Sequence, residues 1–332
     1  MGVKLKGLFE SKTIRMQDLS GKVIAIDAFN WIFQFLTTIR LADGSYLTDS
    51  KGRVTTHLNG IFYRSAALLE NRVNPVFVFD GKAPRFKKGT LQEREKAKEE
   101  ARMMVEKAGT EEERAMYLRR LSRIDDYIID SSKELLTYMG IKFIQAPAEG
   151  EAQAAWMSKQ GLAFAAASQD YDTLLFGAKR VIRNLNIGNR KKISRKGITT
   201  QVSPEIIEAE HNFKKLEIDR EKLILISLFT GTDYNKGVEG IGPKKAMKLV
   251  KEENREKLFN TYDFRSDYNI REVFEYFLKP DVVEVSGDMT SKRIQKEKLM
   301  DFLCNEHSFS QDRVQQFLEK LDREENSLAF YG

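Results

Sequence analysis

Short apolar segments that end in an acidic or small residue, and are followed by helical spacing, most strongly constrain the fold of this 332-residue chain. Four segments have this character, at residues 23–27, 76–80, 141–144 and 164–168. Strands that alternate with helices in this way are typical of a sheet whose parallel strands are joined by crossover helices. The sequence therefore predicts an α/β fold with a mostly parallel central sheet flanked by helices.

Composition excludes several classes of protein. No apolar run approaches the roughly 20 residues that a membrane-spanning helix needs, and the first residues contain no apolar block of signal-peptide length. Cys304 is the single cysteine and cannot form an internal disulfide. We therefore expect a cytoplasmic protein without membrane contact. With 55 basic and 49 acidic side chains the net charge is only +6, so polyanion binding depends on where the charges lie.

Three segments differ from the strand pattern. From about 82 to 130 lysine, arginine and glutamate dominate, which predicts exposed helices inserted between strands. Between residues 178 and 204 there are eight basic residues and no acidic one, so this run either positions phosphates or is a flexible solubilising loop. From about 223 to 251 a glycine-rich turn separates two stretches of helical spacing, which predicts a helix-turn-helix.

Four aspartates follow strand candidates. Asp27 and Asp80 each end one, and ligands of open α/β sheets bind at the carboxyl ends of the strands. Asp170 and Asp172 follow a third strand, and a spacing of two in extended chain directs both side chains to the same side. A lone aspartate at a strand end is more often a helix cap. The occurrence of four aspartates at strand ends is what favours a binding site.

Three more carboxylates complete the predicted cluster. Glu149 and Glu151 lie where a helix is expected to begin, and a spacing of two on a regular helix would turn them to opposite faces, so we expect unequal roles. Asp233 precedes the glycine-rich turn. Seven clustered carboxylates must either take up protons or bind cations.

The donor chemistry favours a divalent cation. Oxygen ligands suit Mg²⁺ or Mn²⁺, and the three histidines have no zinc spacing. Two such ions about 4 Å apart can activate a water and stabilise the leaving oxygen during phosphodiester cleavage. A phosphohydrolase of the aspartyl-phosphate kind is excluded, because Phe29 stands where its second aspartate is required.

Several motifs along the chain include these acids and the glycine-rich turn. They are Val-Ile-Ala-Ile-Asp-Ala at 23–28, Phe-Gln-Phe-Leu at 33–36, Phe-Asp-Gly-Lys at 79–82, Ala-Glu-Gly-Glu-Ala-Gln-Ala at 148–154, Ser-Gln-Asp-Tyr-Asp at 168–172, Leu-Leu-Phe-Gly at 174–177, Gly-Thr-Asp-Tyr-Asn at 231–235 and Gly-Ile-Gly-Pro-Lys-Lys-Ala at 240–246. In this order, and over nearly the whole chain, they resemble the flap endonucleases, the structure-specific 5′-nucleases of replication and repair, and specifically their archaeal members.

The resemblance implies a PIN-like 5′-nuclease core at 1–257, with a helical arch inserted at about 82–130 and a duplex-binding helix-turn-helix at about 223–251. A C-terminal helical region at 258–320 and a tail at 321–332 follow. It implies that the seven carboxylates bind two Mg²⁺ ions, for which Mn²⁺ can substitute, and that the helix-turn-helix binds K⁺. The implied partner is branched or flap DNA, and we expect a monomer.

Further site residues follow from the resemblance alone. Lys87 and Arg94 match two residues at the base of the arch that contact the scissile phosphate; the alternative is a solvated charged face. Phe33 matches an aromatic that stacks on a nucleobase; the alternative is core packing. The other residues expected to contact DNA are Arg64, Lys191, Lys192, Gly240, Gly242, Lys244, Lys245 and Lys248.

One departure from the family concerns the tail. Its members usually end in a peptide that binds the sliding clamp, with a glutamine, an aliphatic residue and two aromatics at fixed spacing. If Leu328 takes the aliphatic position, Glu325 replaces the glutamine and Gly332 replaces an aromatic. We therefore expect a degenerate clamp-binding peptide.

Three functions are compatible with these features. The first is metal-dependent cleavage of 5′ flaps in DNA, with 5′-3′ exonuclease activity expected alongside. The second is binding to DNA junctions without cleavage, which the complete set of carboxylates argues against. The third is action on bubbles, four-way junctions or 5′ ends by a relative with the same core, which the short insert makes second to flap cleavage.

Overall fold

A seven-stranded sheet forms the centre of the protein. The computed structural model describes residue 5 and residues 7–185, 190–192 and 199–329. The strand order is β1-β9-β6-β5-β2-β3-β4, in which β6, β5, β2, β3 and β4 are parallel while β9 and β1 run antiparallel to their neighbours. The strands are β1 (Lys12–Thr13), β2 (Val23–Asp27), β3 (Asn74–Phe79), β4 (Lys142–Gln145), β5 (Ala165–Ala167), β6 (Arg180–Arg183) and β9 (Glu205–Glu208). The predicted mostly parallel sheet is confirmed.

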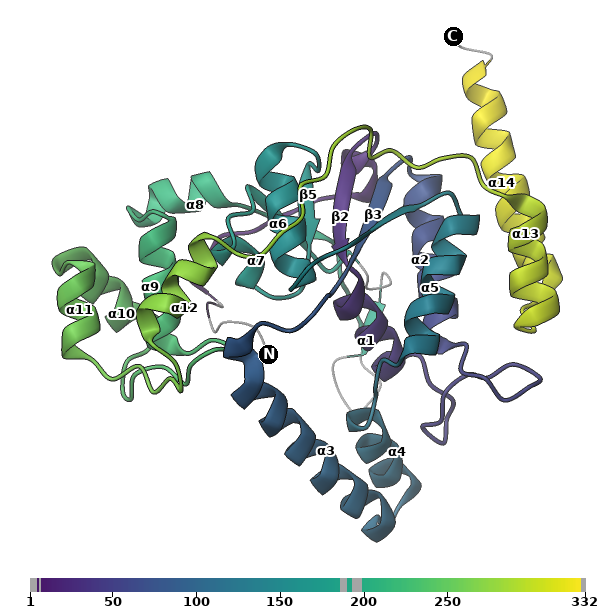
Figure 1. Ribbon diagram of the computed structural model, residues 1–332. Helices are drawn as coiled ribbons and strands as arrows, with labels where there is room; N and C mark the ends of the chain where they lie inside the picture. Colours follow the sequence, from purple (N-terminus) through teal and green to yellow (C-terminus); the bar gives the residue numbers. More distant parts are fainter. Residues whose placement is uncertain (1–4, 6, 186–189, 193–198, 330–332) are drawn as a thin grey trace.

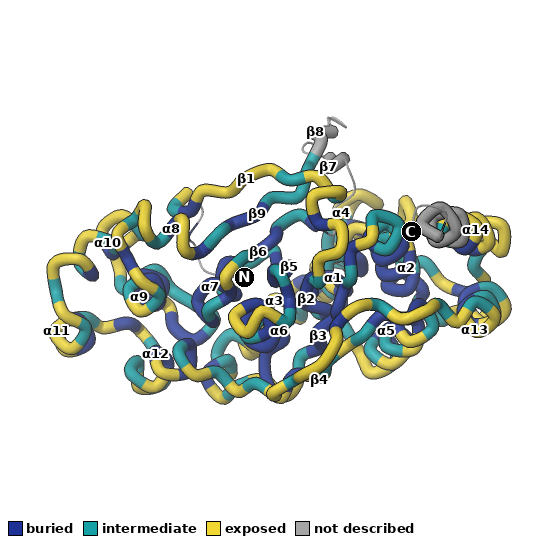
Figure 2. The backbone as a smooth tube through the Cα atoms, turned by 90° about the horizontal axis from the view of Figure 1, so that it is seen from above, coloured by how far each residue is buried: buried dark blue, intermediate teal, exposed yellow. Residues whose placement is uncertain are grey.

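Helices cover both faces of this sheet (Figures 1 and 2). The face that carries Ala25, Val76 and Val78 packs against α6, α7, α9 and α12. The opposite face, with Ile24 and Phe77, packs against α1, α2, α5 and the C-terminal helices. These helices are α1 (Ala28–Thr38), α2 (Thr56–Glu70), α5 (Asp126–Tyr138), α6 (Gly150–Gln160), α7 (Asp172–Leu175), α9 (Arg220–Thr230), α12 (Ile270–Leu278), α13 (Lys296–Met300) and α14 (Gln311–Ala329). Successive strand residues thus alternate between two apolar clusters, which fixes the position of the strand ends.

Smaller elements complete the chain. A second sheet pairs β7 (Arg190–Lys192) with β8 (Thr199–Gln201) in antiparallel orientation. The remaining helices are α3 (Lys88–Lys107), α4 (Glu111–Arg120), α8 (Ala209–Leu216), α10 (Pro243–Glu252) and α11 (Arg255–Thr261), together with the short turns η1 (Met16–Leu19) and η2 (Arg85–Lys87) and the π-helix η3 (Asp301–Glu306). Among the described residues, no helix is both long and apolar enough to cross a membrane.

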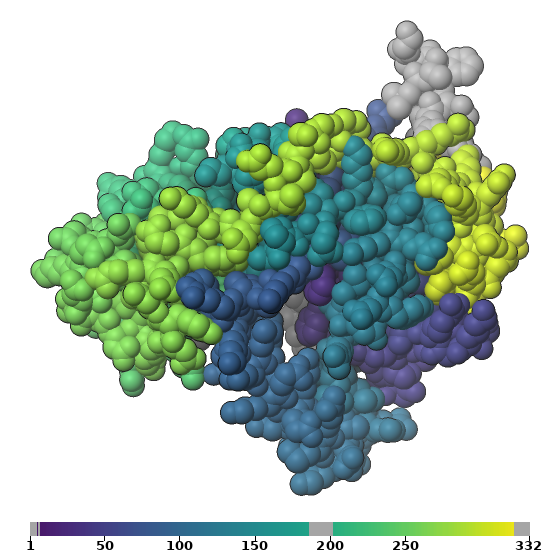
Figure 3. Space-filling view, in the orientation of Figure 1, coloured from purple at the N-terminus to yellow at the C-terminus, as the bar shows by residue number. Residues whose placement is uncertain are grey.

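Helices α3 and α4 form a hairpin that projects beyond the carboxyl ends of the parallel strands (Figure 1). Ala101 and Ala115 are buried on these helices, and most of their other residues are exposed or partly exposed. Gly44, in the loop between α1 and α2, approaches α4 so closely that a Cβ there would lie 2.6 Å from the Cα of Ala115. The space-filling view shows an opening between the hairpin and the body of the protein (Figure 3). The hairpin falls within the segment for which exposed helices are predicted, whereas the domain boundaries stay a prediction.

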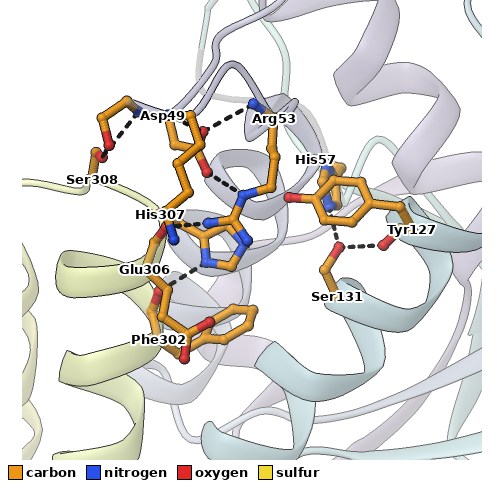
Figure 4. A network of polar contacts seen from close by, with 11 residues as sticks. Asp49, Arg53, His57, Tyr127, Ser131, Phe302, Glu306, His307 and Ser308 are labelled. Atoms are coloured by element: carbon orange, nitrogen blue, oxygen red, sulfur yellow. Dashed lines mark hydrogen bonds and ion pairs between the residues drawn. The ribbon is translucent and has the colours of Figure 1, made fainter.

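A buried polar network attaches the C-terminal helices to the core (Figure 4). Arg53 pairs with Asp49 at 2.7 Å and donates to the carbonyl oxygen of Glu306 in the π-helix. The Nε2 atom of His57 lies 2.8 Å from the hydroxyl of Ser131, and the Nδ1 atom of His307 lies 2.9 Å from the carbonyl oxygen of Phe302. Since a carbonyl only accepts hydrogen bonds, His307 carries its proton on Nδ1.

The tautomer of His57 follows by the same reasoning. The Ser131 hydroxyl donates to the carbonyl oxygen of Tyr127 at 2.6 Å, so its oxygen accepts from the Nε2–H group of His57. The unprotonated nitrogens are therefore Nδ1 of His57 and Nε2 of His307. Neither has a hydrogen-bond partner among the described residues. Burial, followed by the neighbouring His307, lowers the pKa of His57 to about 3.

The network predicts a loss of stability in acid. An imidazole that is neutral when folded and protonated when unfolded stabilises the protein above its unfolded pKa of 6.5, and this contribution falls as the pH falls toward 3. The free energy of unfolding should therefore decrease by about 2 kcal/mol more in the wild type than in His57→Gln between about pH 7 and pH 5. Denaturant titrations at the two pH values measure this difference. His211→Gln, at an exposed histidine, is measured in parallel as the control for a surface substitution.

Candidate active site

Two carboxylates lie at the carboxyl ends of the neighbouring strands β2 and β3. Asp27 ends β2 and caps α1, where it accepts a hydrogen bond from the backbone N–H of Asn30 at 3.0 Å. Asp80 follows β3 and accepts from the N–H of Gly150, the first residue of α6, at 2.8 Å. Both aspartates thus face the N-terminus of a helix, where exposed N–H groups and the helix dipole favour negative charge.

The two glutamates at the start of α6 make different contacts. Glu149 caps the helix, is buried, and accepts from the hydroxyl of Tyr234 and from Lys87. Glu151, in the first turn, accepts from the hydroxyl of Ser168 at 2.5 Å. This difference fits the expectation of unequal roles, whose origin is the irregular entry into the helix.

Mutual repulsion shows that the carboxylates form one cluster. Burial, and then the charges of Asp80 and Asp170, raise the pKa of Asp27 to about 8. Desolvation raises the pKa of Asp80 to about 6, and the charge of Glu149 adds to this shift. Around Glu151, desolvation and the charges of Asp172, Asp27 and Asp170 raise the pKa well above its usual value. The fold thus brings together six of the seven predicted carboxylates.

The seventh carboxylate joins the cluster through two cations. Arg94 pairs with Asp233 at 2.8 Å, and Lys87 pairs with Asp233 at 3.6 Å as well as with Glu149. The side chain of Lys87 is only 17% exposed, so it is not part of a solvated charged face. Although desolvation opposes its charge, the carboxylates, led by Glu149, raise the pKa of Lys87 above its ordinary value.

The donor set fits hard divalent cations in its chemistry. It consists of carboxylate oxygens, and seven carboxylates face two cationic side chains, so the others must take up protons or bind cations. Within the described residues, however, no group of three or more His, Cys, Asp or Glu side chains is arranged to hold a metal ion. Each hydrogen bond and ion pair above occupies a carboxylate oxygen that a metal ion would use.

Comparisons with known proteins identify the family of this chain. The XPG N-terminal domain matches residues 1–101 and the XPG I-region matches residues 140–233. Flap endonuclease 1 of Pyrococcus horikoshii is 45% identical over 97% of this chain and 94% of its own, and that of Archaeoglobus fulgidus is 44% identical over 97% and 96%. This chain belongs to the archaeal flap endonucleases. The resemblance stated from the motifs is confirmed.

Solved structures of relatives confirm the fold. The flap endonuclease from Methanococcus jannaschii superimposes with a TM-score of 0.76 at 37% identity, covering 96% of this chain and 98% of that one. The catalytic core of Rad2 in complex with DNA substrate, at 22% identity and a TM-score of 0.69 over 94% and 96% of the two chains, shares the fold. Nucleases of the flap endonuclease family depend on metal ions.

The residues expected to contact DNA lie in several places of this flap endonuclease. Phe33 on α1 is 48% exposed, which contradicts core packing. Arg64 on α2 is largely desolvated, which lowers its pKa, and one of its buried Nη atoms has no partner among the described residues. Lys191 and Lys192 belong to β7, but their side chains lie outside the described part of the protein, as do the side chains of the predicted clamp-binding tail.

The predicted helix-turn-helix consists of α9, a loop and α10. Gly240 has a φ of +70°, and no atom lies within 4 Å of the position of a Cβ at Gly240 or Gly242. Lys244, Lys245 and Lys248 are exposed on α10. Open backbone and exposed lysines on one surface can accommodate phosphates.

Tyr234 and Ser168 are site residues that sequence reasoning missed. Both are buried, and their hydroxyls donate to Glu149 and Glu151 respectively. Each lies next to or two residues from a predicted carboxylate, in motifs already noted for their acids. Attention to hydroxyl donors within those motifs could have identified them.

Because the cluster is strained by like charge, removal of one carboxylate should stabilise the metal-free flap endonuclease. Because its pKa is raised to about 8, Asp27 is mostly protonated in the folded protein at neutral pH, whereas it is ionised in the unfolded chain. This difference lowers the free energy of unfolding. Asp27→Asn should therefore raise the free energy of unfolding in EDTA by about 1 kcal/mol or more near pH 7. Thermal unfolding measures the effect. A destabilised Asp27→Asn, beside an unchanged Asp130→Asn on the exposed side of α5, would contradict this expectation.

Proposed function

We propose that this chain is a structure-specific 5′ flap endonuclease that hydrolyses phosphodiester bonds in branched DNA near the junction of single strand and duplex. The observation that supports it best is the carboxylate cluster at the ends of β2 and β3, with Lys87 and Arg94 reaching it from the base of the α3–α4 hairpin. The membership of the chain in the flap endonuclease family adds independent support.

Mg²⁺ is the cofactor proposed, with Mn²⁺ as a substitute, and K⁺ at the turn between α9 and α10. When bound, a pair of divalent ions supplies an activated water and stabilises the leaving oxygen. The residues proposed to hold the ions are Asp27, Asp80, Glu149, Glu151, Asp170, Asp172 and Asp233. Tyr234 orients Glu149 and Ser168 orients Glu151, each by donating a hydrogen bond from its hydroxyl.

The cationic and aromatic residues position the DNA. Lys87 and Arg94 can stabilise the charge that develops on the phosphoryl oxygens during cleavage. Phe33 offers an exposed face for stacking with a nucleobase, while Gly240, Gly242 and the lysines of α10 receive the backbone of the duplex. The hairpin would admit a single-stranded 5′ end, so substrates are selected by shape and not by base sequence.

The proposed setting is a cytoplasmic monomer that acts on flaps during replication and repair. Recruitment by a sliding clamp would depend on the degenerate tail. Rates on flap, nicked, bubble and four-way-junction DNA of equal length test the preference. A chain that cleaves bubbles or junctions faster than flaps would belong with the third function considered above.

Removal of one metal ligand should abolish chemistry and spare binding. Asp170→Asn keeps the shape of the side chain but removes its charge, and single-turnover cleavage of a 5′ flap in Mg²⁺ should fall on the order of 1,000-fold. Far-UV circular dichroism and flap affinity should change little. The surface variant Asp126→Asn serves as the control. Undiminished cleavage by Asp170→Asn would refute the assignment of the cluster.

Lys87 should contribute more to the chemical step than to binding. Lys87→Ala is expected to slow single-turnover cleavage roughly 100-fold, because a charge close to the reacting phosphate is lost. The affinity for flap DNA should fall much less. Lys88→Ala, at the adjacent exposed position, is the matched control and should cleave at the wild-type rate. Equal losses of rate and affinity would make Lys87 a binding residue only.

A further inference from the structure

Three residues at the base of the α3–α4 hairpin contact two of the predicted metal ligands. Lys87 pairs with Glu149 and Asp233, and Arg94 pairs with Asp233 at 2.8 Å. Between them, the hydroxyl of Thr90 donates to the carbonyl oxygen of Asp233 at 2.5 Å. Spacings of three, four and seven place these side chains on one side of α3 and the turn before it. One face of the hairpin base is therefore attached to the acidic cluster.

These ion pairs are poorly solvated. The exposed fractions are 17% for the side chain of Lys87, 10% for Glu149 and 13% for Asp233, whereas Arg94 is 39% exposed, so the pairs of Lys87 are the more desolvated ones. Two other ion pairs also link the hairpin base to the body, Arg85 with Glu272 and Lys236 with Glu93, but the side chains of both are at least half exposed. Exposed pairs contribute little, whereas breaking a desolvated pair leaves a charge uncompensated. The attachment to the cluster is thus the stronger one.

The cations are not shared evenly among the carboxylates. Within the described residues, Asp27, Asp80 and Glu151 form no ion pair; they accept hydrogen bonds from backbone N–H groups and a hydroxyl. Glu149 and Asp233 take both cations. A divalent ion that binds these two carboxylates competes with Lys87 and Arg94 as their counter-ion.

A phosphate oxygen would require the same cationic groups. The Nζ atom of Lys87 donates to Glu149 and lies 3.6 Å from Asp233. A phosphate oxygen would compete with these two carboxylates for the three N–H donors of the ammonium group.

We propose that Lys87 and Arg94 are internal counter-ions of Glu149 and Asp233 in the free protein. Binding of a divalent cation displaces them, which loosens the hairpin base from the cluster and makes both cations available to a DNA phosphate. Only the last step rests on the proposed function, because displacement requires neither DNA nor cleavage.

Linkage gives this exchange a thermodynamic consequence. The divalent cation takes the carboxylate side of each ion pair, and the phosphate takes the cationic side. Each ligand therefore removes the competitor of the other, and each must raise the affinity for the other by the same factor. The attachment of the hairpin base would thus depend on whether a divalent cation is bound to the cluster.

Magnesium binding without DNA tests the displacement. Calorimetry compares the wild type with Lys87→Met, which keeps the aliphatic stem and removes the charge. The variant should bind Mg²⁺ about fivefold or more tightly, because the internal competitor is absent. Lys236→Met, which breaks an exposed pair of the same hairpin base, should bind like the wild type. Unchanged or weaker binding by Lys87→Met would overturn the proposal.

Hydrogen exchange provides the second readout. Mg²⁺ should increase amide exchange in residues 92–100 of α3 in the wild type and leave Lys87→Met, already released, unaffected. Equal protection of the wild type with and without Mg²⁺ would also overturn the proposal. If Lys87→Met fails to fold by circular dichroism, Arg94→Met takes its place in both measurements, with the same expectations and the same contradicting results.

The proposed function can fail separately. A protein that shows tighter Mg²⁺ binding in Lys87→Met and looser α3 in Mg²⁺, yet does not cleave flaps, keeps the counter-ion exchange and loses the nuclease assignment. A protein that cleaves flaps with neither effect loses the exchange alone.

Discussion

Repulsion among buried carboxylates is the constraint on which the rest of this structure depends. Asp27, Asp80 and Glu151 all have pKa values raised by desolvation and by one another. The fold compensates with the N-termini of α1 and α6, two hydroxyls and two cations. Such a cluster opposes folding, so its presence indicates a ligand that neutralises it.

The sheet supplies the rigidity that this cluster requires. Strands β2 and β3 are neighbours with parallel register, so Asp27 and Asp80 necessarily end on the same edge. Buried side chains alternate between two apolar clusters on opposite faces, and a slip of one residue would exchange the faces. The acids are therefore held together by apolar packing that lies behind them.

The sequence predicts those strands whose residues form a recognisable local pattern, and it does not predict those that depend on distant partners. The strands that end in Asp27 and Asp80 are almost wholly apolar and were found, whereas β6 and β9 were missed. The ends of those two strands are charged, and their register places Arg180 opposite Glu208 and Arg183 opposite Glu205. Arg180 and Arg183 contact the rings of Phe164 and Tyr171, and these partners are visible only in the folded structure. The pairing of Lys87 with Glu149 and Asp233 is likewise set by the tertiary structure. No local sequence pattern indicates which of the carboxylates will contact this lysine.

Under the proposed function, charge balance would distinguish the free state of this site from a DNA-bound state. In the free protein, Lys87 and Arg94 are the cations in ion-pair contact with Glu149 and Asp233 among the described residues. A scissile phosphate would bring further negative charge and compete for the same two cations, so the repulsion among the carboxylates would rise. Protons or cations from solution would then have to offset that charge.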